Sequence, residues 1–370
     1  MRPSPLPIAF GMFGLVWGAW QAALPDLAAH YDLSSGPLGA ILTAGFALSL
    51  PAMLGTGRLL DRLGAGWGIG LTAVVMAAGL VLVGVLPALP LLVVAVVLFA
   101  SGSGAYDVAI NGAAMGDESW SRPARLTLLH AAFSGGGVVG AVAAGALLGT
   151  PISFQATYPT LAVALLGAGI LAGTAAWPAR REHASVPRGV AMAMLPLAAL
   201  AGLAFLAEGS METWSAIYLR DDLGAVAFVG ALGPAAFHAA MFVGRLVGAA
   251  VAGRLGAAST LMAAGSMTAV GMAVALLVPS PAVAIPGMAL AALGASFVVP
   301  VVVSMAAGRA GPNAGRAASY VLTLGYAGFL VGPSLVGILG EVSGLRVALT
   351  VVPLAAILIV IASRTRLARA

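Results

Sequence analysis

The stretch GRLLDRLG at residues 57–64 is the most informative part of this chain. It lies in a short gap between two long apolar runs. A reduced copy of its second half, GRLG at residues 253–256, follows 192 residues later (253 − 61), again between apolar runs. Two matching halves in a very apolar chain indicate a membrane protein built by duplication, which is a common plan among secondary transporters.

The composition places the chain in a membrane. Charged residues are 8% of the sequence, against about 25% in a soluble protein, and the mean hydropathy is +1.06. Such a chain cannot cover a water-facing surface, so we expect a lipid bilayer around it. The apolar residues form long runs rather than the short alternating segments of a β-barrel. We therefore expect an all-α membrane protein, whose 50 glycines favour close helix packing.

The positive charge of the chain indicates its orientation in the membrane rather than binding to a nucleic acid. The net charge is +5, and all 17 basic residues are arginines that stand mostly between apolar runs, as the positive-inside rule requires. The absence of cysteine excludes disulfides and thiolate chemistry. No His-Glu-x-x-His motif or P-loop is present, so we expect no enzyme activity, cofactor or metal site. The glycines of residues 135–145 are interpreted as helix-packing positions.

Apolar runs long enough to span a bilayer occur twelve times. They define two half-domains, residues 1–178 and 190–370, joined by a cytoplasmic linker at residues 179–189. The expected spans are 7–28, 37–57, 67–87, 90–115, 126–149, 157–178, 190–218, 228–252, 259–279, 284–308, 317–340 and 347–363.

The arginines predict the orientation. With a cytoplasmic N-terminus, fourteen arginines fall in inside segments and only Arg220 and Arg346 fall outside, so we expect both termini to be cytoplasmic in a multi-pass protein of the cell inner membrane. Arg245 falls within the eighth run, where it either pairs with a buried acid or snorkels to the cytoplasmic side.

These features resemble the major facilitator superfamily. Its signature after the second span is a glycine, three residues, Asp-Arg, one residue, a glycine and a basic pair. Here the basic pair is missing and the rest is kept as Gly57, Asp61, Arg62 and Gly64. The resemblance implies twelve transmembrane helices in two pseudo-symmetric six-helix bundles. It also implies a conformational latch, in which Asp61 faces the cytoplasmic N-terminus of the eleventh span, near Arg316.

Three further segments resemble the bacterial YbjJ-like group of this superfamily, which is distantly similar to fucose-type sugar permeases. They are residues 102–111, 130–135 and 208–218, and residues 325–326 with 332–333 add to the likeness. The resemblance implies a central cavity lined by the first and seventh spans. The resemblance also places Trp20 and Gln21 near Glu208, although these residues of the first span alternatively serve helix packing. The cavity-lining candidates are Trp17, Trp20, Gln21, Trp214, His238 and Tyr326.

Ionisable residues within a span are costly and are therefore functional candidates. Asp107 and Asn111 are four residues apart, on one helix face; they form either a substrate or proton site, or a structural acid tied to a neighbouring helix. Glu208 and Glu212 repeat this spacing, and their mutual repulsion favours proton binding, although Glu212 alternatively marks the outer mouth. His130 is either a proton exchanger or a neutral packing residue.

We expect from this pattern a secondary active transporter that moves a small solute, sugar-like or another small metabolite, by alternating access. The residues expected to couple it to protons are Glu208 and Asp107, although buried acids serve Na⁺ equally. The alternative is efflux of a drug or secondary metabolite on the same fold. The expected partners are the small-molecule substrate, the coupling ion and the bilayer, with the chain acting as a monomer.

Overall fold

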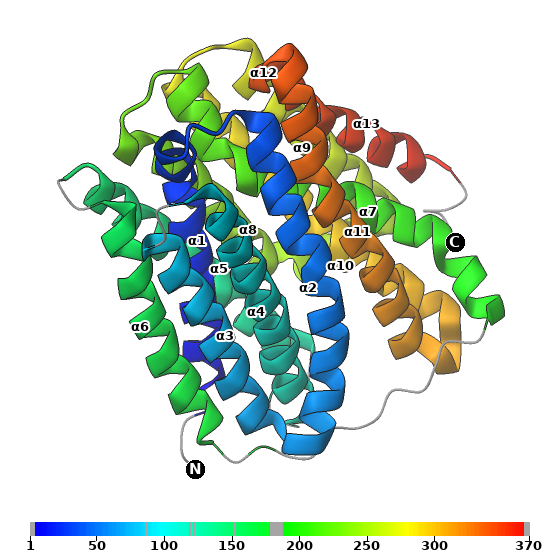
Figure 1. Cartoon of the computed structure of the whole chain (residues 1–370). Helices are drawn as coiled ribbons and strands as arrows, with labels where there is room; N and C mark the ends of the chain where they lie inside the picture. Colours follow the sequence, from blue (N-terminus) through cyan, green and yellow to red (C-terminus); the bar gives the residue numbers. More distant parts are fainter. Residues whose placement is uncertain are drawn as a thin grey trace. The chain divides into compact units, whose positions relative to one another are not determined.

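The computed structural model describes residues 4–85, 88–117, 120, 123–150, 153–175, 177 and 188–365. Within these residues the chain forms helices and no strands (Figure 1). The α-helices are α1 Leu6–His30, α2 Ser35–Leu63, α3 Ala65–Val85, α4 Leu89–Gly116, α5 Pro123–Leu148, α6 Phe154–Gly173, α7 Arg188–Ile217, α8 Ala227–Leu255, α9 Ala257–Leu277, α10 Pro281–Ala310, α11 Ala314–Ser343, α12 Leu345–Ala348 and α13 Val351–Ser363.

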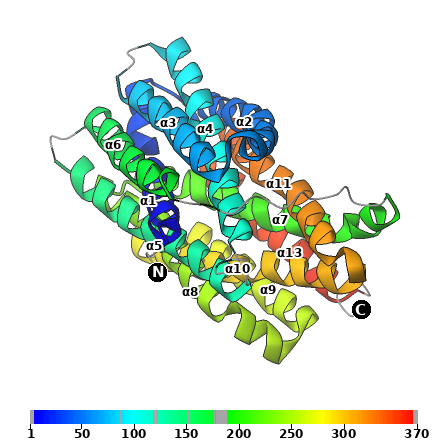
Figure 2. The ribbon, with the colours of Figure 1, turned by 90° about the horizontal axis from the view of Figure 1, so that it is seen from below.

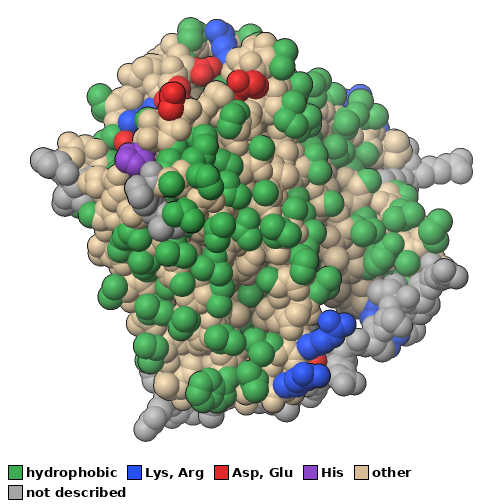
Figure 3. Space-filling view, viewed as in Figure 1, with side chains coloured by type: hydrophobic (Ala, Val, Ile, Leu, Met, Phe, Trp, Pro, Cys, Tyr) green, Lys and Arg blue, Asp and Glu red, His purple; other side chains and the backbone are tan. Residues whose placement is uncertain are grey.

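Twelve segments of the described chain are long and apolar enough to cross a membrane. The last of them, residues 345–363, joins the short helix α12 to α13. Each predicted span overlaps one of these segments, so the prediction of an all-α protein with twelve spans is confirmed. Hydrophobic side chains are spread over the face drawn in Figure 3, and few charged ones interrupt them, as contact with lipid requires.

The chain divides into two compact units. Unit 1 comprises residues 1–181 with 226–235, and unit 2 comprises residues 182–225 with 236–370. The predicted linker, residues 179–189, lies outside the described residues except for its last two, where α7 begins. The exact half-domain boundaries therefore stay a prediction.

Unit 1 is held together by close helix contacts. Helix α1 packs along α5, and α3 packs between α4 and α6; Figure 2 shows α1 beside α5. A Cβ atom added to Gly136 of α5 would collide with the carbonyl oxygen of Gly11, and one added to Gly18 of α1 would collide with that of Gly137. Glycines at these positions let the two backbones touch, which is how membrane helices associate without a hydrophobic driving force.

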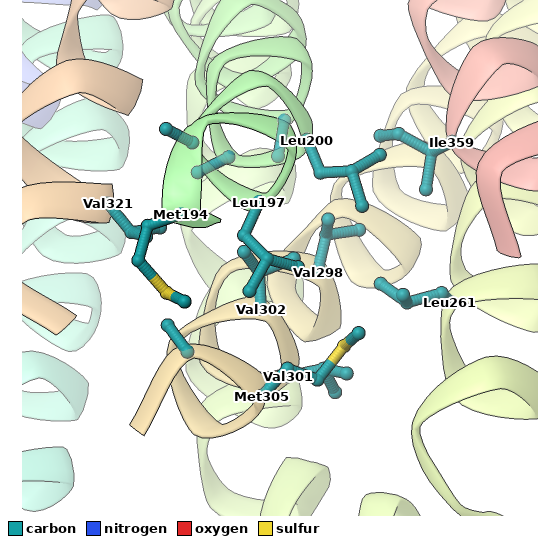
Figure 4. Close-up of a cluster of buried hydrophobic side chains, with 14 of the residues drawn as sticks. Met194, Leu197, Leu200, Leu261, Val298, Val301, Val302, Met305, Val321 and Ile359 are labelled. Atoms are coloured by element: carbon teal, nitrogen blue, oxygen red, sulfur yellow. The ribbon is translucent and has the colours of Figure 1, made fainter. Parts of the chain in front are cut away.

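Unit 2 repeats this helix packing with the equivalent helices. Helix α7 packs along α11, and α9 packs against α10 and α13. The core between them is a cluster of buried aliphatic side chains (Figure 4) that includes Leu197, Leu200, Val298 and Val302. A Cβ atom on Gly328 of α11 would collide with the carbonyl oxygen of Gly202 on α7, just as Gly136 would with Gly11 in unit 1.

Equivalent helices of the two halves of the chain are separated by a nearly constant number of residues, which changes by one at a single place. Helices α2 and α8 both have 29 residues and begin 192 positions apart (227 − 35). Helices α3 and α9 both have 21 residues and also begin 192 apart (257 − 65). Equivalent contacts on α1 and α7, however, are 191 apart (202 − 11). The second half of the chain therefore contains one extra residue between the α7 contact and the start of α8.

The extra residue coincides with a π-helical turn, Tyr218–Asp222, at the end of α7. A π-turn takes up an inserted residue because its hydrogen bonds run from i to i+5. The Tyr218 hydroxyl donates a hydrogen bond to the carbonyl of Ala275 on α9 (3.1 Å). Asp222 accepts one from the backbone N–H of Arg346 on α12 (3.1 Å), and the Arg346 Nε donates to the carbonyl of Leu276 (2.6 Å). The turn thus ties the end of α7 to α9 and α12.

The stretch at residues 57–64 ends in a turn, and residues 253–256 end in an equivalent one. Helix α2 ends at Leu63, and Gly64 follows with φ +80°. Gly256, between α8 and α9, has φ +76°. A residue with a side chain adopts such a conformation only at a cost, so glycine at both positions permits the sharp reversal between adjacent spans.

Candidate coupling and substrate sites

Helix α7 places two acids on one face in the middle of unit 2. Glu208 and Glu212 are one helical turn apart, and their carboxylates interact electrostatically. Glu208 is 7% exposed and Glu212 is half-buried. Two like charges this close in an apolar bundle repel strongly, because the low dielectric does not screen them. The two acids thus interact along α7, and their role in proton binding stays a prediction.

Arg245 of α8 provides the opposite charge. Its guanidinium lies within electrostatic range of both Glu208 and Glu212, and also of Tyr326 on α11. This electrostatic interaction favours pairing with an acid, rather than snorkelling, for this arginine. We call Glu208, Glu212 and Arg245 the acid–arginine cluster. With all three groups ionised, the two carboxylates and one guanidinium leave the cluster with one net negative charge. The cluster lies among apolar helices.

His238 and Trp214 are buried side chains on the two helices that carry this cluster, α8 and α7. His238 is on the same helix as Arg245, two turns earlier, interacts electrostatically with it and is 1% exposed. Trp214 is fully buried, and its Nε1 donates a hydrogen bond to the carbonyl of Pro333 on α11 (3.1 Å). In this conformation the indole joins α7 to α11. A cavity-lining role for it stays a prediction that requires a second conformation.

Unit 1 contains a different arrangement on α4. The amide Nδ2 of Asn111 donates hydrogen bonds to the carboxylate Oδ1 and to the backbone carbonyl of Asp107, each at 2.9 Å. Both side chains are half-buried. One turn earlier, the Ser103 hydroxyl accepts a hydrogen bond from Nε1 of Trp17 on α1 (3.1 Å). The ring of Trp17 stacks on Phe46 of α2, with 5.9 Å between centroids and 12° between planes.

The other predicted residues of unit 1 are packed among aromatic rings. Trp20 is 2% exposed and lies 4.5 Å from the ring centroid of Phe99 and 5.4 Å from that of Tyr158. Gln21 is buried. His130 is half-buried and meets the ring of Phe10 edge-on, with 5.5 Å between centroids. These contacts are equally compatible with packing and with the proposed proton exchange of His130.

The latch residues lie at the exposed end of α2. Asp61, Arg62 and Gly64 are exposed, and Gly57 is half-buried. The predicted contact of Asp61 with the eleventh span would join the two units, and so would the predicted closeness of Trp20 and Gln21 to Glu208. Both stay predictions.

Two residues of unit 1 that contact the predicted site residue Trp17 were not predicted from the sequence. Phe46 was one apolar residue among many in its run, and no sequence signal marked it as the stacking partner of Trp17. Ser103 was detectable, because it precedes Asp107 by four residues and therefore shares its helix face.

Comparison with known proteins establishes the family. The model of the Major Facilitator Superfamily matches residues 6–281. A curated MFS-type transporter of Yersinia pestis is 33% identical over 371 residues, covering 97% of this chain and 94% of the relative. The membrane protein MosC of Rhizobium meliloti is 28% identical over 365 residues, covering 96% and 88%. The chain belongs to the major facilitator superfamily, and it is a transporter rather than an enzyme.

Solved structures show the same fold at low sequence identity. A point mutant of the nucleoside transporter NupG matches with a TM-score of 0.79 and 12% identity, covering 97% of this chain and 98% of that one. The transporter FucP in its outward conformation matches with a TM-score of 0.66 and 16% identity, covering 97% of each chain. These matches confirm the major facilitator fold and the multi-pass membrane location that follows from it.

Proposed function

We propose that this chain is a proton-coupled secondary transporter that carries a small neutral solute by alternating access between two half-domains, residues 1–178 and 190–370. The acid–arginine cluster is the observation that carries the proposal. Two carboxylates and one guanidinium in an apolar bundle leave one uncompensated negative charge, and such a charge is costly away from water. Binding one proton would neutralise the cluster.

Neutralisation links the ion to the conformational change. A group that binds a proton in one conformation and releases it in another shifts the balance between them by its differential affinity. Glu208 is the buried acid of the cluster and Glu212 the more exposed one. We therefore assign the coupling proton to Glu208 and treat Glu212 as its path to the solvent.

The remaining features support a bacterial inner-membrane location. The arginine distribution favours cytoplasmic termini, and the Asp61 latch would then lie on the cytoplasmic side. Names of related structures are compatible with sugar-like or nucleoside-like cargo, since NupG is a nucleoside transporter and FucP a fucose–proton symporter.

Transport into proteoliposomes tests the coupling. Wild type and Glu208→Gln are compared with a metabolite panel, with a pH gradient imposed in each direction and, separately, a Na⁺ gradient. We expect the variant to lose gradient-driven accumulation and to keep solute exchange, because glutamine preserves the shape but cannot release a proton. The direction of the effective gradient identifies uptake or efflux.

The matched control is Glu341→Gln, which changes an exposed glutamate of α11. It should leave gradient-driven accumulation unchanged. Equal accumulation by wild type and Glu208→Gln would refute the assignment of Glu208 as the coupling residue, and accumulation driven only by Na⁺ would refute proton coupling.

A further inference from the structure

The repeat allows the two units to be compared position by position. The offset of 191 between α1 and α7 aligns Trp17 with Glu208 (208 − 17) and Gln21 with Glu212 (212 − 21). The contacts that set this offset are those of Gly136 with Gly11 and Gly140 with Leu15, which unit 2 repeats as Gly328 with Gly202 and Gly332 with Leu206.

The offset of 192 extends the comparison to α2 and α8. Phe46 aligns with His238 (238 − 46), and Met53 aligns with Arg245 (245 − 53). Every ionisable position around the acid–arginine cluster thus has an uncharged counterpart in unit 1. Where unit 2 carries two acids, a histidine and an arginine, unit 1 carries two aromatic rings, an amide and a thioether.

Helix α4 shows the reverse difference. Asp107 and Asn111 of α4 align with Val299 and Val303 of α10 at the same offset of 192 (299 − 107). The hydrogen-bonded acid–amide pair therefore exists only in unit 1 among these equivalent positions. At these equivalent positions the two units differ in opposite directions, because unit 2 has its charged groups on α7 and α8 and unit 1 has its acid–amide pair on α4.

We infer that the cargo binds to unit 1, and that it is a neutral ring with neighbouring hydroxyl groups. Trp17 and Phe46 form the apolar surface on which such a ring would lie, and Asp107 with Asn111 would bind its hydroxyls. This inference rests on the proposed transport function but not on proton coupling, which concerns unit 2.

The arrangement of the polar atoms selects this chemistry. The amide nitrogen of Asn111 donates to Oδ1 and to the backbone carbonyl of Asp107, so the Asp107 carboxylate and the Asn111 amide oxygen are the acceptors that this helix face offers. Two neighbouring hydroxyls are matching donors, and hydrogen bonds to a carboxylate are about twice as strong as neutral ones. The half-buried ring of Trp17 is held in place by Ser103, so little conformational entropy is lost on stacking.

An anion fits the same residues less well, because the Asp107 carboxylate would repel it. A cation would be attracted by that carboxylate, and choline is the probe that tests this alternative. A neutral polyol donates hydrogen bonds both to the carboxylate and to the amide oxygen of Asn111 and needs no opposite charge.

Equilibrium binding by the purified full-length protein, without any gradient, tests the inference. The probes are D-galactose, L-fucose and uridine as neutral polyols, with glucose 6-phosphate and choline as the anionic and cationic comparisons. We expect at least one neutral polyol to bind wild type, and Asn111→Ala and Phe46→Leu each to weaken it at least tenfold. The matched control Val303→Ala, at the position equivalent to Asn111, should change the affinity less than twofold.

The outcomes separate this inference from the coupling proposal. Thermal unfolding of each variant establishes that it is folded. If Asn111→Ala does not fold, Phe46→Leu, which keeps an apolar side chain, provides the test. Tighter binding of choline or glucose 6-phosphate than of every polyol would overturn the inference, as would no polyol binding to wild type or an equal loss in Val303→Ala. If Glu208→Gln accumulates solute as wild type does while Asn111→Ala loses polyol binding, only the assignment of Glu208 as the coupling residue is refuted.

Discussion

Arg245 is the residue on which the charge balance of unit 2 depends. Arg245→Leu leaves Glu208 and Glu212 facing each other without a cation, and removing one partner of a buried ion pair costs about 3–5 kcal/mol. Because Arg245 is only half-buried, we expect a loss of about 3 kcal/mol, at the low end of that range, seen as a lower unfolding temperature in detergent. Arg245→Leu combined with Glu212→Leu should be more stable than Arg245→Leu alone, because it removes one charge of each sign.

Arg254→Leu is the matched control for this prediction. It lies on the same helix but at its exposed end, so it should leave the unfolding temperature within error of wild type. Strictly additive losses in the double variant would show that the three side chains do not form one electrostatic unit.

At the scale of the element, the packing of α1 on α5 depends on the absence of a side chain. Gly136→Ala places a Cβ atom against the carbonyl oxygen of Gly11, so the helices must separate, and we expect a loss of about 1–3 kcal/mol. Gly167→Ala, on α6, meets nothing within 4 Å. It should stabilise the protein slightly, by up to about 1 kcal/mol, because alanine is the better helix former. Unfolding temperatures of the two variants check this, and an equal response would contradict it.

At the scale of the whole molecule, we expect the Asp61 latch to control how readily the transporter changes conformation. The interaction of an acid with a helix N-terminus is worth about 0.3–1 kcal/mol, so Asp61→Asn should change the initial transport rate by up to about fivefold. Equilibrium affinity for the solute should stay within about twofold. The control is Asp32→Asn, an exposed acid between α1 and α2 with φ 51°, a conformation that asparagine tolerates. Equal effects of both variants on the rate would contradict the latch.

The sequence alone predicted the twelve spans, because run length and hydropathy are local properties that lipid selects directly. It also predicted the repeat from GRLLDRLG and its copy, and the geometry of Gly64 and Gly256 agrees. It did not predict the extra residue at the π-turn Tyr218–Asp222, because nothing in the local pattern distinguishes a π-turn from an α-helical one.

Sequence reasoning selected Asp107, Asn111, Glu208 and Glu212, since a polar group in an apolar run stands out and the i, i+4 spacing is a property of one helix. The sequence did not decide the partner of Arg245, because that partner depends on which face of α8 packs toward α7. The stacking of Trp17 on Phe46 was unforeseen for the same reason. Contacts within a helix follow from the order of residues, whereas contacts between helices depend on their packing, so only the tertiary structure decided them.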